Sequence, residues 1–271
     1  MKRLSWFNTT SLTLGFAFLY LPMIILMIYS FNASKLVTVW AGFSTKWYGE
    51  LFQNEAFLDA AWVTLRVAVV SSTIATVLGT MAAYVLVRGG RFMGRTLFSG
   101  MIYAPLVMPE VITGLSLLLL FIGIGLDRGV LTIVLAHTTF SMCFVSVVVS
   151  SRLVTFDKSL EEAALDLGCS AFQAFRLVTL PIIAPAVISG WLLAFTLSLD
   201  DLVIASFTAG PSATTLPIKI WSSIRLGVSP EINALSTILI AIVTIGVVTA
   251  SLVSKRALMR QEAEEQAAVR A

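Results

Sequence analysis

Charged residues are scarce in this sequence, because Asp, Glu, Lys and Arg together make up only 12% of its 271 residues. In soluble globular domains these four residue types account for about 25%. Hydrophobic residue types form 58% of the chain, and the mean hydropathy is +0.93. The composition excludes an ordinary soluble domain and indicates an integral membrane protein.

Residues that bind metals or form disulfides are also few, with one His and two Cys. A disulfide would have to join Cys143, inside an apolar run, to Cys169, which follows a polar segment, so we expect both thiols to be free. His137 has no second His or Cys cluster near it and is expected to be a hydrogen-bonded core residue, with no metal bound. No combination of nucleophile, base and metal points to a membrane enzyme.

Long uncharged runs predict an all-α protein with six transmembrane helices, because a spanning helix needs about 20 apolar residues. The first run follows Lys2 and Arg3 but is too long for a signal peptide and lacks a small-residue cleavage site, so it is expected to be retained. Pro105 and Pro109 predict a bent third helix. The fifth helix is expected to continue past its acidic pair to about residue 208. The runs are 12–34, 67–87, 96–126, 129–151, 182–199 and 232–254.

The distribution of basic residues predicts the orientation, because Lys and Arg are enriched on the cytoplasmic side. With the N-terminus inside, five basic residues fall outside: Lys35, Lys46, Arg128, Lys219 and Arg225. The cytoplasmic side then receives the larger group, which consists of Lys2, Arg3, Arg88, Arg91, Arg95, Arg152, Lys158, Arg176, Lys255, Arg256, Arg260 and Arg270. Both termini and the 152–181 loop are therefore predicted to be cytoplasmic. This asymmetry accounts for the pI of about 9.0 without nucleic-acid binding.

Three parts follow along the chain. Residues 1–61 hold the first helix and an external segment whose Trp and Tyr residues predict a short interfacial helix. Residues 62–256 form the core transmembrane domain, and residues 257–271 form a polar cytoplasmic tail.

One short polar segment, 159–168, interrupts the apolar sequence on the predicted cytoplasmic side. As a helix it places Leu160, Ala163, Ala164 and Leu167 on one face, at positions i, i+3, i+4 and i+7. Ser159 followed three residues later by Glu162 predicts a capping box, and Gly168 predicts the end of the helix. An ordinary connector helix lying on the protein's own surface is the alternative.

The pattern of this segment resembles the EAA motif of ABC importer permeases. Glu162-Ala163-Ala164 is followed at the family spacing by Gly168 and by Val178-Thr179-Leu180-Pro181, with Val178 where isoleucine is usual. The resemblance implies a coupling helix that inserts into a cleft of a cytoplasmic ATPase. Residues assigned to this contact are Glu161, Glu162, Ala163, Ala164, Asp166 and Gly168.

Other segments resemble the polyamine transporter permeases, which include putrescine and spermidine systems. The resemblance covers nearly the whole chain and implies the type I ABC importer (MetI-like) fold in the inner membrane. The implied partners are a second permease subunit, two copies of the ABC ATPase and a periplasmic polyamine-binding protein, within a lipid bilayer. The segments are 29–32, 47–48, 104–114, 199–207 and 215–217.

ATP hydrolysis is expected to belong to the partner. The loop from Gly89 to Thr96 comes near a phosphate-binding sequence but lacks its lysine and joins two membrane helices. The chain is therefore expected to bind no cofactor, with ATP and Mg²⁺ used by the ATPase subunits.

Three acids fall in or beside the predicted spans and are candidates for a cation pathway: Glu110, Asp200 and Asp201. Glu110 lies about 22 Å of helical rise from Arg95, near mid-membrane. The structural alternatives are a salt bridge to Arg66 or a helix cap for Glu110, and a helix-end or interhelix hydrogen bond for Asp200.

Trp191 and Phe195 precede the acidic pair by about two turns and one turn. Their ring faces could attract an ammonium group. Simple packing or contact with lipid is the alternative for both.

Two other functions stay open. The same importer could carry a sugar or an anion such as sulfate, phosphate or molybdate, although an acidic pathway argues against anions. An ion-coupled secondary transporter could use the acids as proton carriers, but such folds show inverted repeats with broken helices in both halves. Only one proline-broken acidic helix is evident here.

Overall fold

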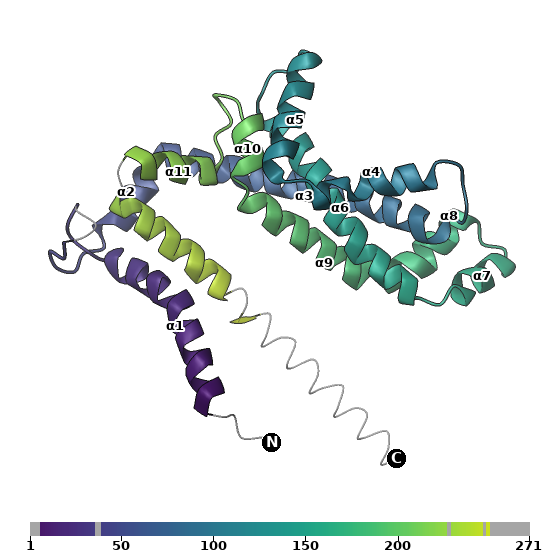
Figure 1. Ribbon diagram of the computed structural model, residues 1–271, viewed down its shortest axis with the longest axis horizontal. Coiled ribbons are helices and arrows are strands. Elements are labelled where there is room, and N and C mark those ends of the chain that lie inside the picture. The colour runs from purple at the N-terminus through teal and green to yellow at the C-terminus, as the bar shows by residue number, and fades with distance from the viewer. Residues whose placement is uncertain (1–5, 36–38, 227–228, 246–247, 250–271) are drawn as a thin grey trace. The chain divides into compact units, whose positions relative to one another are not determined.

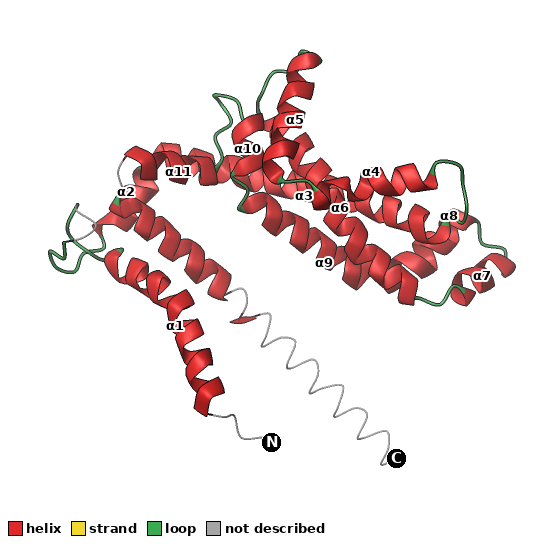
Figure 2. Cartoon of the chain, viewed as in Figure 1, coloured by secondary structure: helices red, strands yellow, loops and turns green. Residues whose placement is uncertain are grey.

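The computed structural model describes residues 6–35, 39–226, 229–245 and 248–249, and the regular elements among them are helices (Figures 1 and 2). The chain divides into two compact units. One combines Met1–Glu55 with Ser223–Ala271, and the other is Ala56–Ser222.

The first unit contains α1 (Trp6–Tyr29), α2 (Lys46–Gln53) and the helix Pro230–Ile245. Helix α1 carries its own apolar side chains on all sides, and none of its residues is buried within the chain. A short helix, α2, lies in the segment where the aromatic residues predict one. Its Trp47 side chain donates to the Asn32 carbonyl over 2.6 Å.

The core of the second unit is formed by α3 (Glu55–Arg88), α6 (Val130–Thr155) and α9 (Leu180–Leu199). Ala83, Val145, Val149 and Ile183 are completely buried there. Gly79 allows α3 to approach α6 closely, because a Cβ at this position would lie 2.8 Å from the Met142 carbonyl oxygen. Small residues at such contacts are typical of helix packing in membranes.

The third predicted span is broken into α4 (Arg95–Val107) and α5 (Glu110–Gly123), and the helix axis bends by 117° between them. Pro109 directly precedes α5 and cannot donate a backbone hydrogen bond to the preceding turn. The predicted bend is confirmed.

The fifth predicted span ends at the acidic pair, and the expectation that it continues as one helix to residue 208 is wrong. Asp200 caps the C-terminus of α9, and a separate helix, α10 (Val203–Thr208), begins after Leu202. The Asp201 carboxylate accepts hydrogen bonds from the backbone N–H groups of Ile204 and Ala205, at 3.2 and 2.7 Å. This side chain therefore starts a new helix, which packs against α5 and α6.

Within the residues that the structure describes, four helical stretches are long and apolar enough to span a membrane, and the bent α4–α5 pair makes a fifth if it counts as one span. The helix Pro230–Ile245 covers the beginning of the sixth predicted span. Residues 246–247 and 250–254 of that span lie outside the described residues, as do Lys2, Arg3 and the predicted tail. The long stretches are Trp6–Tyr29, Glu55–Arg88, Val130–Thr155 and Ala171–Leu199.

The remaining elements of the second unit are short. The polar segment forms α7 (Ser159–Asp166), and α8 (Ala171–Ala174) leads through the π-helix η1 (Phe175–Thr179) into α9. Helix α11 (Leu216–Leu226), which continues past the last residue of this unit, begins where the Leu216 N–H donates to the Thr64 hydroxyl on α3, at 2.7 Å.

Candidate coupling helix and pathway acids

Helix α7 begins differently from the predicted capping box. The Asp157 carboxylate accepts a hydrogen bond from the Ser159 N–H at 2.9 Å, while Glu162 instead pairs with Lys158 at 2.9 Å. The Ser159 backbone hydrogen bond is the main reason that the pKa of Asp157 is lowered, with the Ser159 hydroxyl also contributing. The box prediction is wrong because Lys158 occupies the cap position and leaves Ser159 as the first helical residue.

The C-terminus of α7 agrees with the sequence prediction. Gly168 has φ of +89°, in the left-handed region where glycine has no Cβ penalty. Its N–H donates to the Leu165 carbonyl at 2.9 Å, and the Cys169 N–H donates to Ala164 at 3.1 Å. The predicted stop at Gly168 is confirmed.

Glu161 is directed into its own chain. Its carboxylate lies 3.1 Å from Arg88 Nε and accepts a hydrogen bond from the Thr179 hydroxyl at 2.8 Å. The Glu161 side chain is only 9% exposed. Glu161, one of the residues assigned to the ATPase contact, therefore holds α7 against the rest of its own chain.

The other assigned residues divide between the two faces of α7. Ala164 is buried beside Glu161, whereas Glu162, Ala163, Asp166 and Gly168 are exposed. The predicted apolar face is therefore split, because Leu160 and Leu167 point outward with exposures of 49% and 87%. The exposed surface of α7 therefore carries leucines, a small residue and two carboxylates.

The π-helix η1 brings Thr179 into contact with α7, and this element was not predicted from the sequence. Pro181 lacks an N–H and cannot satisfy the carbonyl four residues earlier, so a regular helix is interrupted at this point. An inserted wide turn is the usual form of a π-helix inside a longer helix. The proline was the available sequence signal.

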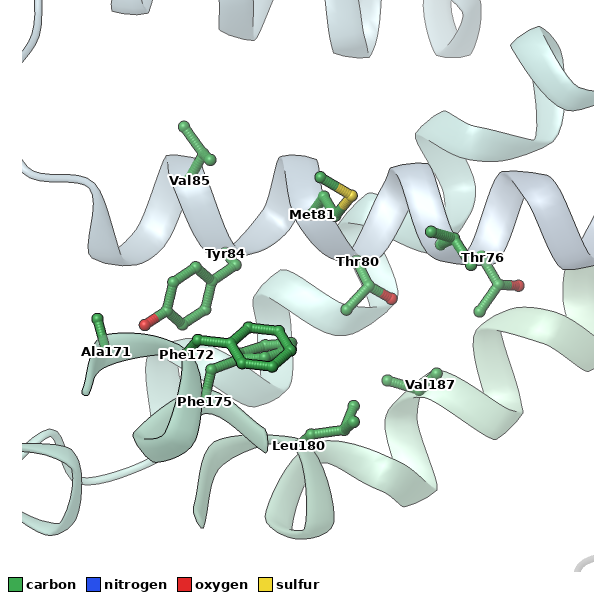
Figure 3. Close-up of a pocket in the computed structure, with 11 residues that line it drawn as sticks. Thr76, Thr80, Met81, Tyr84, Val85, Ala171, Phe172, Phe175, Leu180 and Val187 are labelled. Atoms are coloured by element: carbon green, nitrogen blue, oxygen red, sulfur yellow. The ribbon is translucent and has the colours of Figure 1, made fainter. Parts of the chain in front are cut away.

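An apolar cavity of about 620 Å³ lies beside η1, between α3 and the α8–η1–α9 stretch (Figure 3). Tyr84 on α3 and Phe175 on η1 meet there edge to face, with ring centroids 5.0 Å apart. The cavity holds no charged side chain, and its lining residues are Thr76, Val77, Thr80, Met81, Tyr84, Val85, Ala171, Phe172, Phe175, Leu180 and Val187.

The three predicted pathway acids have different surroundings. Glu110 is the first residue of α5 and is exposed, and it forms no ion pair with Arg66, which the structure also describes. Asp200 is exposed at the end of α9. Asp201 is only 9% exposed and lies 3.1 Å from His137 Nε2.

His137 joins Asp201 to a buried polar chain. Its Nδ1 lies 2.6 Å from the Ser198 hydroxyl, which accepts a hydrogen bond from Ser71 at 3.2 Å. The predicted role of His137 as a hydrogen-bonded core residue is confirmed. His137 and Ser198 are 2% and 3% exposed, so this cluster connects α3, α6, α9 and α10 inside the unit and offers no open nucleophile.

Trp191 and Phe195 stack on each other with ring centroids 5.1 Å apart and an interplanar angle of 9°. The Trp191 indole N–H also donates to the Thr73 hydroxyl on α3 at 3.1 Å. Both rings are half-buried, so the packing alternative accounts for much of their surface. Among the described residues, no group of three His, Cys, Asp or Glu side chains comes together as a metal site.

Comparison with known proteins identifies the family. Residues 75–260 match the family described as "Binding-protein-dependent transport system inner membrane component". The putrescine transport system permease protein PotI of Escherichia coli K12 is 60% identical over 240 residues, which cover 86% of this chain and 85% of that protein. The spermidine/putrescine permease PotC of the same strain is 44% identical, over 90% of this chain and 92% of its own length.

Solved structures support the fold. A bacterial ABC transporter that imports the polysaccharide alginate has a chain with a TM-score of 0.70 at 17% identity, covering 90% of this chain and 93% of its own. The methionine transporter MetNI, in an inward-facing conformation, gives a TM-score of 0.59 at 17% identity, over 72% and 92%. The predicted all-helical, MetI-like importer fold is confirmed. The chain belongs to the binding-protein-dependent transport system inner membrane components, and it is a multi-pass permease with no catalytic role of its own.

Proposed function

We propose that this chain is a permease subunit that carries polyamine, with putrescine as the first candidate, through an ATP-driven importer by alternating access. The relatives named for putrescine and spermidine transport align over more than four fifths of the chain. Two exposed acids, Glu110 and Asp200, give the second unit a chemistry suited to a cation. Sugars and anions are the competing cargoes.

The exposed face of α7 is the observation that supports coupling to an ATPase. Glu162, Ala163, Asp166 and Gly168 are all exposed, as are Leu160 and Leu167. Exposed leucines outside an apolar span are costly in water, and protein interfaces combine apolar and charged side chains. We assign α7 to the cleft of a cytoplasmic ATPase, which uses ATP and Mg²⁺.

The complete importer contains this chain, a second permease subunit, two ATPase copies and a periplasmic polyamine-binding protein. Both termini of this chain are cytoplasmic, on the same side as α7. ATP binding closes the ATPases, and the motion of α7 opens the pathway to the binding protein. Hydrolysis and separation of the ATPases then return the permease to its inward-facing state.

Asp200 and Glu110 lower the electrostatic barrier to a dication, while Asp201 holds the backbone that presents Asp200. The Asp201 carboxylate is already hydrogen-bonded to His137 and to two backbone N–H groups. Binding to the exposed acids must stay weak, since conduction requires release as well as entry. Trp191 and Phe195 contribute ring faces beside the same end of α9.

The cargo is tested by ATP-dependent uptake of labelled putrescine into proteoliposomes that hold the complete complex. We expect polyamines, but no sugar, to compete, and Asp200→Asn and Glu110→Gln to reduce uptake while ATPase assembly persists. Asp127→Asn removes an exposed carboxylate away from these positions and serves as the control. A complex that hydrolyses ATP but takes up only a sugar would contradict the polyamine assignment.

The docking surface is tested by Glu162→Lys, which reverses one exposed charge on α7. We expect the chain to remain folded while the copurifying ATPase is lost and uptake stops. Glu50→Lys makes the same charge change on α2 and should leave both intact. Normal uptake and a full ATPase complement in Glu162→Lys would rule out this surface.

A further inference from the structure

A single buried carboxylate connects α7 to the rest of the second unit. Glu161 contacts Arg88, the last residue of α3, and Thr179, the last residue of η1. Arg88 also donates from Nη2 to the carbonyl of Phe156, which caps α6, at 3.0 Å. The end of α3 and the beginning of α9 therefore meet at one residue of α7, and Arg88 extends this contact to the end of α6.

The Glu161 carboxylate is buried, so it is stable only when all of its partners are in place. The Arg88 and Glu161 side chains are 11% and 9% exposed, and Thr179 is completely buried. A carboxylate with so little access to water needs its opposite charge and its hydrogen-bond donors in place. The planar guanidinium of Arg88 can donate to Glu161 and Phe156 at once because its donors have a fixed fork geometry.

Aromatic contacts surround the same point. The Arg88 guanidinium lies over the Phe156 ring, 5.4 Å from its centroid. One turn earlier on α3, Tyr84 meets Phe175 of η1 (Figure 3). These contacts tie η1 and the end of α6 to α3 independently of α7, so Glu161 is the polar side chain through which α7 joins an existing assembly.

Helix α7 has few other attachments. It is connected to its neighbours by short segments, and the segment after it turns at Gly168 in the left-handed conformation. Its second buried residue is the small Ala164. Without the Glu161 contact, α7 could change its angle relative to α3 and α9 while remaining attached along the chain.

We infer that Glu161 and Arg88 are positioning residues that lock α7 to α3 and α9, so that movement of α7 reaches both membrane helices as one rigid displacement. The inference rests on the proposed docking of an ATPase to α7. In this arrangement Glu161 makes no contact with the ATPase. It sets how much of the ATPase motion is converted into opening of the pathway.

The test compares polyamine uptake per ATP hydrolysed in the complete complex. Glu161→Gln keeps the size of the side chain and removes its charge. Arg88→Lys keeps the positive charge but loses the planar guanidinium that donates to two acceptors at once. We expect both to assemble with the ATPase and hydrolyse ATP, while uptake per ATP falls about tenfold, within the usual range of coupling free energies. Asp127→Asn is the control for loss of an exposed carboxylate.

The exchange Arg88→Glu with Glu161→Arg should recover part of the loss, since residues in contact give non-additive effects. Thermal unfolding of each variant is measured in parallel. If Glu161→Gln has the wild-type uptake per ATP, the inferred positioning role is wrong. This holds even if the melting temperature of the variant falls, because the contact would then contribute to stability alone. If Glu161→Gln fails to assemble with the ATPase, the uptake per ATP of Arg88→Lys tests the inference instead.

Failure of the proposed docking has a different signature. A wild-type chain that copurifies with no ATPase would overturn the docking and this inference together. A wild-type complex that transports polyamine, with unchanged uptake per ATP in both single variants, would overturn the lock alone.

Discussion

Neighbouring acidic residues in this chain have opposite environments. Glu161 and Asp201 are held by partners within the chain, whereas Glu162, whose ion pair with Lys158 is itself exposed, and Asp200 remain on the surface. In each pair, one carboxylate stabilises the local fold, and the other is the one that we propose for contact with a partner or a cation. A change of charge should therefore have different effects at adjacent positions.

Asp201→Ala is expected to lower the free energy of unfolding of the purified chain by about 2 kcal/mol, because two backbone N–H groups of α10 lose their acceptor and His137 loses its carboxylate partner. Chemical denaturation in detergent micelles measures this change. The matched variant Asp200→Ala should stay within about 0.5 kcal/mol of wild type, as is usual for exposed positions. Equal destabilisation by the two variants would contradict the division of roles.

Asp157 is expected to titrate below its ordinary pKa because the Ser159 N–H donates to the ionised form. A lowered pKa in the folded state stabilises the start of α7 above the unfolded pKa of about 3.9. That contribution is lost as the pH falls through the folded pKa. Amide hydrogen exchange of α7 across acidic pH measures it, and Asp157→Asn should remove this acid-dependent change.

At the scale of elements, the close approach of α3 to α6 depends on Gly79. Gly79→Ala places a Cβ 2.8 Å from both the Met142 oxygen and Val145 Cβ, so we expect about 1–3 kcal/mol of destabilisation. Gly100→Ala in α4 is the control, because nothing lies within 4 Å of its added Cβ and alanine favours a helix. Thermal unfolding of both variants distinguishes crowding from a general intolerance of glycine replacement.

The length of α7 depends on its C-terminal glycine. Gly168→Ala forces a Cβ into the left-handed region, which costs about 1–2 kcal/mol. We expect α7 to fray and the ATPase to bind less tightly, as measured by copurification and by hydrogen exchange of α7. Gly90 has a similar φ of +62° in the loop before α4, so Gly90→Ala is the control for strain outside α7.

At the scale of the whole molecule, the proposed topology puts α7 and both termini on the cytoplasmic side. A membrane-impermeant maleimide should label Cys169 in inverted vesicles but not in intact spheroplasts. Cys143 is completely buried and should stay unlabelled in both, with Cys169→Ser as the blank. Phe43→Cys in a Cys169→Ser background should show the reverse pattern, since Phe43 is 73% exposed in the predicted external segment.

Labelling of Cys169 from the outside would reverse the orientation. Such a result would also place α7 out of reach of a cytoplasmic ATPase. The experiment therefore links the arrangement of charges along the chain to the proposed direction of transport.

Much of the fold and of the candidate site follows from local sequence. Apolar runs located the long helices, Pro109 located the bend between α4 and α5, and Gly168 located the end of α7. Each of these features depends on a residue and its immediate neighbours, as does the spacing of Glu162, Ala163, Ala164 and Gly168 that resembles the importer motif. Short-range periodicity and backbone geometry are sufficient to predict them.

The choice between neighbouring polar residues was decided only by tertiary structure. Asp201 starts a new helix directly after the end of α9 because His137, 64 residues earlier, and the α10 backbone surround its carboxylate. Glu161 turns inward because Arg88, 73 residues earlier, and Thr179 on a π-helix meet it there. The sequence by itself determined where the long apolar helices lie and which family the chain resembles. Which acids are paired and which are exposed depends on charges and donors from distant helices, because a buried carboxylate is stable only where those partners converge.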